Sequence, residues 1–580
     1  MAAARIAPFM PARTRTTSRS RSDGRGGSRP RPRAGRAAPS PEPASRSVCL
    51  VSLGCSKALV DTEVMGGHLA RAGLALVGSP EDSDVVIINT CGFIDEAREE
   101  SLATVRHYAA MKRAGTLRGV VVTGCLVQLH ESQLRAELPD VDAFLPISDY
   151  SGVPSIVDAL LGHAPSDVCA GGEAGRAPLA RAATDAGVAT GRASAARSAA
   201  AAAPVERAPL ERAAPERAPL ERAAGDRAPG GMGYPTREIA LPGGLVKQGD
   251  SDLGRALLTA RHTAYLRLGE GCNHVCAFCA IPKIRGKLKS KPLAVLVEEA
   301  GALAQLGVRE LTLIAEDSTD WGKDLPPVAG RGQGLPDLLL ALGDVPDLPW
   351  VRVMYAHPAT IDQRLIETLA AVRNVVPYLD MPVQHGDESV LRRMRRGTSP
   401  ARIREVVGAL RAAIPGITLR TTILVGFPGE TEAAFAQLME LLAELAFDRV
   451  GCFVFSAEES TEAFRLDGAV PRALAEERRA QVMGLQRSLL TSRNLARRGS
   501  RDLVLVDAVE RAVAGSGRLA IGRTATDAPE IDGRVLVELP VRAARGVRDV
   551  QPGDFLSVRI TGAKGYDLTA ALDTGRPSAP

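Results

Sequence analysis

The chain has 580 residues, of which 45% are hydrophobic, 24% charged and only 3% aromatic, and its formal net charge is +5. This length suits three or four domains with sizeable cores. No run approaches about 18 consecutive apolar residues and no short apolar core follows the N-terminal arginines, so the sequence predicts neither a membrane span nor a secretory signal. Nine cysteines in so long a chain are too few for a disulfide scaffold, which predicts reduced thiols or metal ligands in the cytoplasm.

The N-terminal tail, residues 1–46, carries most of the positive charge. It holds eleven arginines against Asp23 and Glu42, a net charge of +9, so the rest of the chain carries −4. Rich in Arg, Ser and Pro, it has too few large apolar residues to offset the entropy of folding, and we expect it to be disordered. An organellar transit peptide is the alternative interpretation. The basic tail therefore gives no reason to expect that the folded body binds nucleic acid.

A second segment, residues 164–255, has the composition of a linker. It is rich in Ala, Arg, Glu and Pro and contains a near-repeat, ERAPLERAAP (206–215) followed by ERAPLERAAG (216–225). A proline every five or so residues forbids a continuous helix, and ten residues are too few for a solenoid unit. We expect a low-complexity linker between two folded blocks.

The first folded block, residues 47–163, alternates strand-like and helix-like patterns. Apolar, β-branched runs of buried-strand length are each followed by a helical stretch, which predicts an open parallel α/β sheet. The runs are VCLVSLG (48–54), VVIINT (85–90) and GVVVTG (119–124).

The second block, residues 256–498, repeats this alternation six times. Six β/α units predict a partial barrel with its site at the carboxyl ends of the strands. Amphipathic helices are expected over residues such as 293–306 and 431–446. The expected strands are AYLRLG (264–269), ELTLIA (310–315), WVRVMYA (350–356), PYLDMPV (377–383), TLRTTILVGF (418–427) and RVGCFVF (449–455).

The third block, residues 501–573, has short alternating strands separated by Gly, Pro and Asp. This pattern predicts a small antiparallel β-barrel. The expected strands are DLVLVDAV (502–509), RVLVELP (534–540) and FLSVRITG (555–562).

Three cysteines of the first block occupy the same position relative to successive strands. Cys55, Cys91 and Cys125 each follow one of the three expected strands. Because the carboxyl ends of parallel strands share one edge of a sheet, three thiols could meet there and hold a metal or a cluster. The alternative is that they are small buried hydrophobic residues, as Cys49 and Cys452 are expected to be.

A second group of three cysteines lies in one loop of the second block. EGCNHVCAFCAIPKIRG (270–286) places Cys272, Cys276 and Cys279 close enough to bind irons of one 4Fe–4S cluster. A zinc knuckle is the alternative. Zinc usually takes four ligands, no second cysteine pair lies nearby, and His274 would be crowded in so short a loop. Three thiolates would leave one iron open to a small molecule.

Taken together, these motifs make the sequence resemble the radical S-adenosylmethionine (AdoMet) enzymes, and among them the methylthiotransferases. The C-x3-C-x2-C loop after the first barrel strand is typical of the superfamily, and the order of a three-cysteine domain, a barrel and a small TRAM barrel is typical of the methylthiotransferases. The motifs resemble the RimO branch, which modifies an aspartate of small ribosomal subunit protein twelve. They are SLGCSKALVDTE (52–63), INTCGFIDEAREES (88–101), VTGCLVQ (122–128), the cysteine loop itself, YLDMPVQH (378–385), RTTILVGFPGETE (420–432) and DAPEIDG (527–533).

The resemblance implies the cofactors and the role of each cysteine. Cys272, Cys276 and Cys279 would hold the 4Fe–4S cluster that cleaves AdoMet, giving a 5′-deoxyadenosyl radical that abstracts hydrogen from an unactivated carbon. Cys55, Cys91 and Cys125 would hold a second 4Fe–4S cluster, whose open iron carries the sulfur to be inserted. A second AdoMet would supply the methyl group. A low-potential electron donor such as flavodoxin or ferredoxin and a sulfur donor would be partners.

The expected contacts with AdoMet lie at two other strand ends. In IAEDST (314–319) family members more often have a glutamine in place of Glu316, so Glu316 or Asp317 could bind the AdoMet amine; a solvated acidic turn is the alternative. Gly426 would allow the adenosine to approach the backbone, although an ordinary β-to-α turn explains the same glycine. Arg420 could contact the AdoMet carboxylate.

The substrate is expected to be the basic ribosomal protein, free or on the ribosome, and the rival is a tRNA adenosine. Residues 501–573 carry ten basic and eleven acidic residues, a net charge of −1, and only Phe555 and Tyr566 as aromatics. An RNA-binding barrel is usually basic and supplies aromatic rings for base stacking. The sequence therefore favours a protein substrate. From a different class, a non-catalytic iron–sulfur protein that binds the ribosome is a further alternative.

Overall fold

The computed structural model describes residues 46–92, 94–147, 150–162, 251–511, 517–540 and 549–573. All of them lie in one compact unit. The predicted tail, except Arg46, and the predicted linker, except residues 251–255, lie outside the described residues. Among the described residues, no helix combines the length and the apolar character that crossing a bilayer requires.

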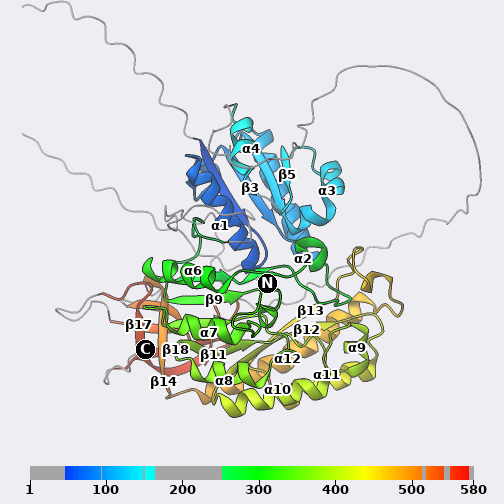
Figure 1. Cartoon of the computed structure of the whole chain (residues 1–580), viewed down its shortest axis with the longest axis vertical. Coiled ribbons are helices and arrows are strands. Elements are labelled where there is room, and N and C mark those ends of the chain that lie inside the picture. The colour runs from blue at the N-terminus through cyan, green and yellow to red at the C-terminus, as the bar shows by residue number, and fades with distance from the viewer. Residues whose placement is uncertain are drawn as a thin grey trace, which may run out of the picture. The chain divides into compact units, whose positions relative to one another are not determined.

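The first block is an open, wholly parallel sheet with helices on its faces, as the sequence predicts (Figure 1). Its strand order is β2-β1-β3-β4-β5. The central strands are buried on both sides, which explains their continuous apolar runs. The strands are β1 (Ser47–Ser52), β2 (Ala75–Val77), β3 (Val85–Thr90), β4 (Gly119–Gly124) and β5 (Ala143–Leu145). The helices are α1 (Ser56–Arg71), η1 (Pro80–Asp82), α2 (Asp95–Arg113), α3 (Cys125–Glu137) and α4 (Val153–Leu160).

The second block is the predicted six-stranded partial barrel. All its strand pairs are parallel, and the order β13-β12-β11-β10-β9-β6 runs steadily back along the chain. The strands are β6 (Thr263–Arg267), β9 (Glu310–Ile314), β10 (Trp350–Val353), β11 (Val375–Asp380), β12 (Thr418–Val425) and β13 (Arg449–Val454).

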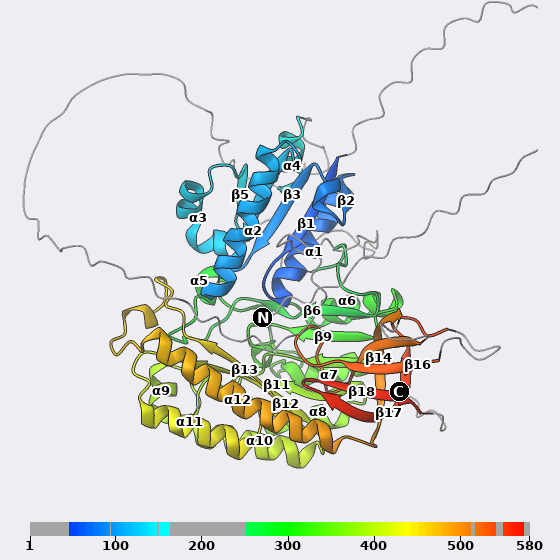
Figure 2. The ribbon, with the colours of Figure 1, turned by 180° about the vertical axis from the view of Figure 1, so that it is seen from behind.

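Helices pack in sequence against the outside of this sheet (Figures 1 and 2). Their buried faces form one continuous apolar core with the strands. The helices are α6 (Leu293–Gln305), α7 (Leu335–Gly343), α8 (Gln363–Ala371), α9 (Glu388–Arg393), α10 (Pro400–Ala413), α11 (Glu432–Leu445) and α12 (Arg472–Ala496). Shorter elements at the strand ends are β7 (Gly269–Glu270), α5 (Ile281–Arg285), β8 (Lys289–Ser290), η3 (Ser318–Asp320) and η4 (Ala463–Arg465).

The third block is a closed five-stranded barrel, drawn in orange and red in Figure 2. It confirms the small β-barrel that the sequence predicts: four of its strand pairs are antiparallel, and one pair, β16 with β18, is parallel. A closed ring with an odd number of strands cannot alternate direction throughout, and one parallel neighbour pair is unavoidable. The strands are β14 (Arg501–Arg511), β15 (Arg518–Thr524), β16 (Val535–Leu539), β17 (Phe555–Lys564) and β18 (Asp567–Leu572).

Residues 251–255, which the sequence places in the linker, are buried. Asp252 accepts hydrogen bonds from Arg267 and from Lys291, the latter at 2.8 Å, and Arg255 donates to the carbonyl of Tyr265 at 2.5 Å. Arg46, placed in the tail, likewise pairs with Asp158 at 2.8 Å. In composition, Arg46 and residues 251–255 resemble the predicted tail and linker beside them. Their contacts with the folded blocks appear only in the structure.

Candidate active site

The structure brings the three cysteines of the first block to one sheet edge. Cys55 is the residue before α1, Cys91 directly follows β3, and Cys125 begins α3 directly after β4. Gly54 has φ +102°, and a Cβ on it would lie 2.8 Å from the Cβ and 3.1 Å from the Sγ of Cys91. Only glycine therefore lets the Cys91 side chain reach the loop that carries Cys55.

The three thiols also influence one another electrostatically. Burial is the largest cause raising the pKa of Cys125; Arg285 acts against it, and the neighbouring Cys55 and Cys91 raise the pKa further. Three mutually repelling thiolates in a buried site need a cation to balance them. We call Cys55, Cys91 and Cys125 the N-terminal trio.

The barrel loop gathers its three cysteines by local backbone hydrogen bonds. Cys272 donates its N–H to the carbonyl of Gly286, and Cys279 donates to the carbonyl of Cys276, both at 3.1 Å. The loop starts at Gly271, whose φ is +72° and where a Cβ would lie 2.2 Å from the carbonyl oxygen of Lys287. We call Cys272, Cys276 and Cys279 the barrel trio.

The thiols of the barrel trio are also shifted by their surroundings. Burial raises the pKa of Cys272 to about 11 and that of Cys279 to about 12, and in both cases the negative charge of Cys276 contributes. Such thiols stay protonated at neutral pH unless a cation binds, and a bound metal deprotonates them. Among the cysteines that the structure describes, the six of the two trios are free thiols, so all six are chemically suited to hold metal.

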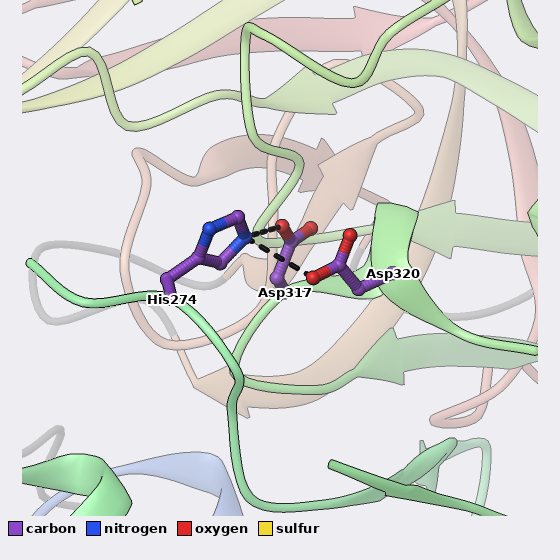
Figure 3. Close-up of side chains that lie close together, drawn as sticks. All are labelled: His274, Asp317 and Asp320. Carbon is purple, nitrogen blue, oxygen red and sulfur yellow. Dashed lines mark hydrogen bonds and ion pairs between the residues drawn. The ribbon is translucent and has the colours of Figure 1, made fainter. Parts of the chain in front are cut away.

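Among the described residues, the one group of three possible ligand atoms within 4.8 Å of one another is His274, Asp317 and Asp320. His274 ties the cysteine loop to the end of β9 (Figure 3). Its Nε2 lies 2.7 Å from Asp317 Oδ2 and 3.2 Å from Asp320 Oδ2, and its ring stacks on that of His357 with centroids 4.5 Å apart. The hydrogen bonds to Asp317 and Asp320 raise the pKa of His274 to about 9, so it is an imidazolium at neutral pH. The His274 imidazolium directs its Nε2 proton at both carboxylates and so holds the cysteine loop to the end of β9. We call His274, Asp317 and Asp320 the His274 clamp.

The residues predicted to contact AdoMet all have partners within the chain. Glu316 Oε1 lies 2.9 Å from Lys57 Nζ, Asp317 belongs to the His274 clamp, and Arg420 Nη1 lies 2.7 Å from Asp380 Oδ1. A Cβ on Gly426 would lie 2.5 Å from the Cβ of Ala475 in α12, so helix packing already requires this glycine. If any of these four residues binds AdoMet, it does so while it also keeps its contact within the chain.

A buried set of charges joins the surroundings of the two trios. Asp61 on α1 accepts from Arg267 at 2.6 Å and from Arg285 at 2.7 Å, while Lys57, one helical turn earlier, contacts Glu316. The side chains of Lys57, Asp61, Arg267 and Arg285 are 4% exposed or less. We call the set the charge bridge; it consists of Lys57, Asp61, Arg267, Glu270, Arg285 and Glu316.

The sequence did not reveal the charge bridge. Lys57 follows Cys55 by two residues and Glu270 precedes Cys272 by two, so proximity to cluster ligands was an available signal. The pairing itself links residues more than 200 positions apart, which no local pattern encodes.

Three family models match successive parts of the chain. The uncharacterized protein family UPF0004 matches residues 47–146, the radical SAM superfamily matches residues 266–442, and the TRAM domain matches residues 499–572. These are the three folded blocks, in the order expected from the motifs.

Curated relatives resemble the chain over nearly its full length. Ribosomal protein uS12 methylthiotransferase RimO of Anaeromyxobacter sp. (strain K) is 36% identical, over 91% of this chain and 93% of its own. The protein of the same name from Anaeromyxobacter sp. (strain Fw109-5) is 37% identical, over 93% and 96%, and that of Syntrophomonas wolfei is 33% identical, over 89% and 98%. The chain belongs to the RimO family, and it is a radical AdoMet methylthiotransferase whose family membership implies a 4Fe–4S cluster and AdoMet.

Proposed function

We propose that this enzyme adds a methylthio group to the β-carbon of an aspartate in ribosomal protein uS12. The barrel trio would hold the cluster that acts with AdoMet, and the N-terminal trio would hold a second 4Fe–4S cluster that delivers the sulfur. The names of the curated relatives support the substrate. The observation that supports the two-cluster proposal is the presence of two separate cysteine trios, one at neighbouring strand ends of the first sheet and one in a single loop of the barrel, with the thiols of each trio close enough to influence one another.

The bound groups would supply chemistry that side chains lack. A 4Fe–4S cluster with AdoMet activates an unactivated carbon for substitution, and a second AdoMet supplies the methyl group. The protein's part is to hold and orient these groups. The His274 clamp fixes the cysteine loop against β9, and the charge bridge fixes α1, which begins next to Cys55, against the barrel strands.

Glu316, Asp317, Arg420 and Gly426 remain our predicted AdoMet contacts. Glu316, Asp317 and Gly426 follow the carboxyl ends of β9 and β12, whereas Arg420 is the third residue of β12. The side chain of Arg420 is 16% exposed beside its partner Asp380. A low-potential reductant such as flavodoxin or ferredoxin and a sulfur donor complete the proposed partners, and the cytoplasm is the proposed location.

Ion pairing in the small barrel supports a protein substrate over tRNA. Several of its basic side chains are already paired with carboxylates: Arg523 with Asp507, Arg518 with Asp549, and Arg501 with Asp573. Cations engaged in this way contribute less to phosphate binding, which supplies most of the affinity for RNA. An approximately neutral barrel instead suits a strongly basic ribosomal protein.

Anaerobic reconstitution followed by mass spectrometry tests the proposal. The full chain with iron, sulfide, AdoMet and a reductant is incubated with the uS12 protein, with 30S subunits, or with unmodified tRNA in parallel. We expect the methylthio mass on one aspartate of uS12 and none on tRNA nucleosides. Modified tRNA with unmodified protein would instead establish the RNA enzyme, and clusters that assemble without any product would favour the non-catalytic alternative.

A further inference from the structure

Arg396 is a buried arginine beside the barrel trio. The residue is 9% exposed. Its Nη2 donates a hydrogen bond to the carbonyl of Pro382 at 2.7 Å, and its Nη1 lies 3.7 Å from the Sγ of Cys276. Its Nε is buried and has no hydrogen-bond partner among the described residues. The guanidinium therefore contacts a carbonyl and the thiol of Cys276, and its buried Nε–H is not used.

No carboxylate of the described residues forms an ion pair with Arg396, which sets it apart from the other deeply buried arginines. Arg267 pairs with Asp61, Arg352 with Glu310 at 2.8 Å, and Arg478 with Glu430 at 3.0 Å. A guanidinium is always protonated, and a buried charge without a counter-charge is strongly unfavourable. Arg396 is thus a buried cation with no directly bonded counter-charge among the described residues.

The backbone, rather than a chance rotamer, places Arg396 at this position. The N–H of Ala277, in the cysteine loop, donates to the carbonyl of Met394 at 2.9 Å. Arg395 then turns the chain with φ +51°, and the N–H of Arg396 donates to the carbonyl of Leu391 at 3.0 Å. Ala277 and Met394 of this junction belong to a buried apolar cluster; its members are Ala277, Val390, Met394, Phe427, Ala434 and Ala463.

We propose that Arg396 is the buried counter-charge of the barrel cluster and that it raises the reduction potential of that cluster. The inference rests on the assignment of Cys272, Cys276 and Cys279 as the cluster ligands. Three thiolates and the cluster core carry net negative charge, which supplies the anion that Arg396 lacks. Arg396 is in this view a positioning and tuning residue that acts through Cys276.

The direction of the effect follows from electrostatics. Reduction adds one negative charge to the cluster, and a nearby cation stabilises the more negative state more strongly than the less negative one. The effect is larger inside a protein than in water, and hydrogen bonds to cluster sulfurs act in the same direction. A low-potential reductant would then reduce the cluster more completely than it could without Arg396.

A redox titration of the full chain tests the proposal. Cys55, Cys91 and Cys125 are replaced by Ala, so that the barrel loop is the one predicted cluster site left. Into this parent we introduce Arg396→Met, Arg396→Gln, which keeps N–H donors without the charge, and Arg396→Lys, which keeps the charge. The matched control is Arg395→Met, because Arg395 is 54% exposed and pairs with Glu462 at 2.8 Å. The reduced fraction is read by electron paramagnetic resonance under dithionite at set potentials.

We expect Arg396→Met to lower the ratio of reduced to oxidised cluster about tenfold at the midpoint of the parent, which for a one-electron couple is a shift of about 59 mV. Arg396→Gln should shift the potential in the same direction, Arg396→Lys should stay nearer the parent, and Arg395→Met should match it. If Met and Gln variants bind no iron while the Lys variant does, the counter-charge role is supported as well.

Three results would overturn the inference. One is an unchanged potential in both Arg396→Met and Arg396→Gln. Another is an unchanged potential together with weaker AdoMet binding by calorimetry, which would assign the guanidinium to the AdoMet carboxylate. The third is loss of the cluster in all three Arg396 variants, which indicates a purely structural role. A parent chain that binds no iron would instead refute the ligand assignment itself, and so the proposed function.

Discussion

The two cysteine trios are brought together in different ways, one by local chain geometry and the other by the pairing of distant strands. The barrel trio spans eight residues of one loop, Cys272 to Cys279, and local backbone hydrogen bonds shape it. The N-terminal trio comes from three strand ends, with 36 residues from Cys55 to Cys91 and 34 from there to Cys125, and exists only because β1, β3 and β4 are parallel neighbours. The first site depends on local chain geometry and the second on a whole domain, so mutations should affect them differently.

The largest expected difference is between single cysteine variants of the two trios. Cys276→Ala should abolish AdoMet cleavage, because it removes a proposed ligand of the cluster that acts with AdoMet. Cys91→Ala should keep cleavage and stop sulfur insertion. Formation of 5′-deoxyadenosine and of methylthiolated substrate, measured on the same reconstituted samples, separates the two effects. Normal methylthiolation by Cys91→Ala would disprove the role of the N-terminal trio.

Iron content should divide equally between the trios. Anaerobic reconstitution should give about eight irons and eight sulfides per chain, since each 4Fe–4S cluster carries four of each. Replacing all three cysteines of either trio should leave about four. Zinc in place of iron at either trio, or about four irons in the unaltered chain, would contradict the two-cluster proposal.

Gly54→Ala should damage the N-terminal trio alone. The new Cβ would lie 2.8 Å from the Cβ of Cys91, on a residue whose φ is +102°. We expect loss of roughly four irons with AdoMet cleavage retained. The control is Gly115→Ala, which has φ +80° but nothing within 4 Å of the new Cβ, so it carries only the backbone strain of about 1–2 kcal/mol. Equal iron loss in both variants would show that strain, not the clash with Cys91, is the cause.

Lys57→Met should weaken the charge bridge without removing a cluster ligand. It leaves Glu316, 11% exposed, with Arg285 as its remaining partner at 3.6 Å. We expect stability to fall by about 3 kcal/mol or less, faster hydrogen exchange in α1 of the metal-free chain, and methylthiolation reduced more than AdoMet cleavage. Lys57→Arg, which keeps the charge, should have a stability, a rate of hydrogen exchange in α1 and a methylthiolation yield close to those of the unaltered chain. Unchanged exchange in Lys57→Met would mean that the bridge does not hold α1 in place.

The smallest expected effect is that of Arg472→Ala. Arg472 pairs with Glu96 at 2.7 Å, but its side chain is 47% exposed and that of Glu96 is 51% exposed. Exposed ion pairs contribute about 1 kcal/mol or less, so thermal unfolding and both product yields should remain close to those of the unaltered chain. A loss as large as that of Lys57→Met would show that burial does not decide which of these ion pairs matter.

The sequence predicted long buried strands well and short or exposed ones poorly. VVIINT and GVVVTG match β3 and β4 residue for residue, because a strand buried on both faces must be apolar throughout. The three-residue edge strands β2 and β5 were missed, since three residues carry no periodic pattern. In the small barrel, β15 and β18 were missed as well, because RLAIGRT contains Gly and Ala and DLTAAL contains two Ala, which are depleted in strands.

By itself the sequence determined the chemistry that the chain can hold: six cysteines in two patterns, on strand ends and in a loop, with motifs that name the family. These features depend on residue identity and short spacings, which a one-dimensional pattern records. Only the tertiary structure decided which charges surround those cysteines. The ion pairs of Glu316, the contact of Arg396 with Cys276 and the close approach of Gly54 to Cys91 depend on distances between residues remote in sequence. Those distances exist only once the strands have paired and the core has packed.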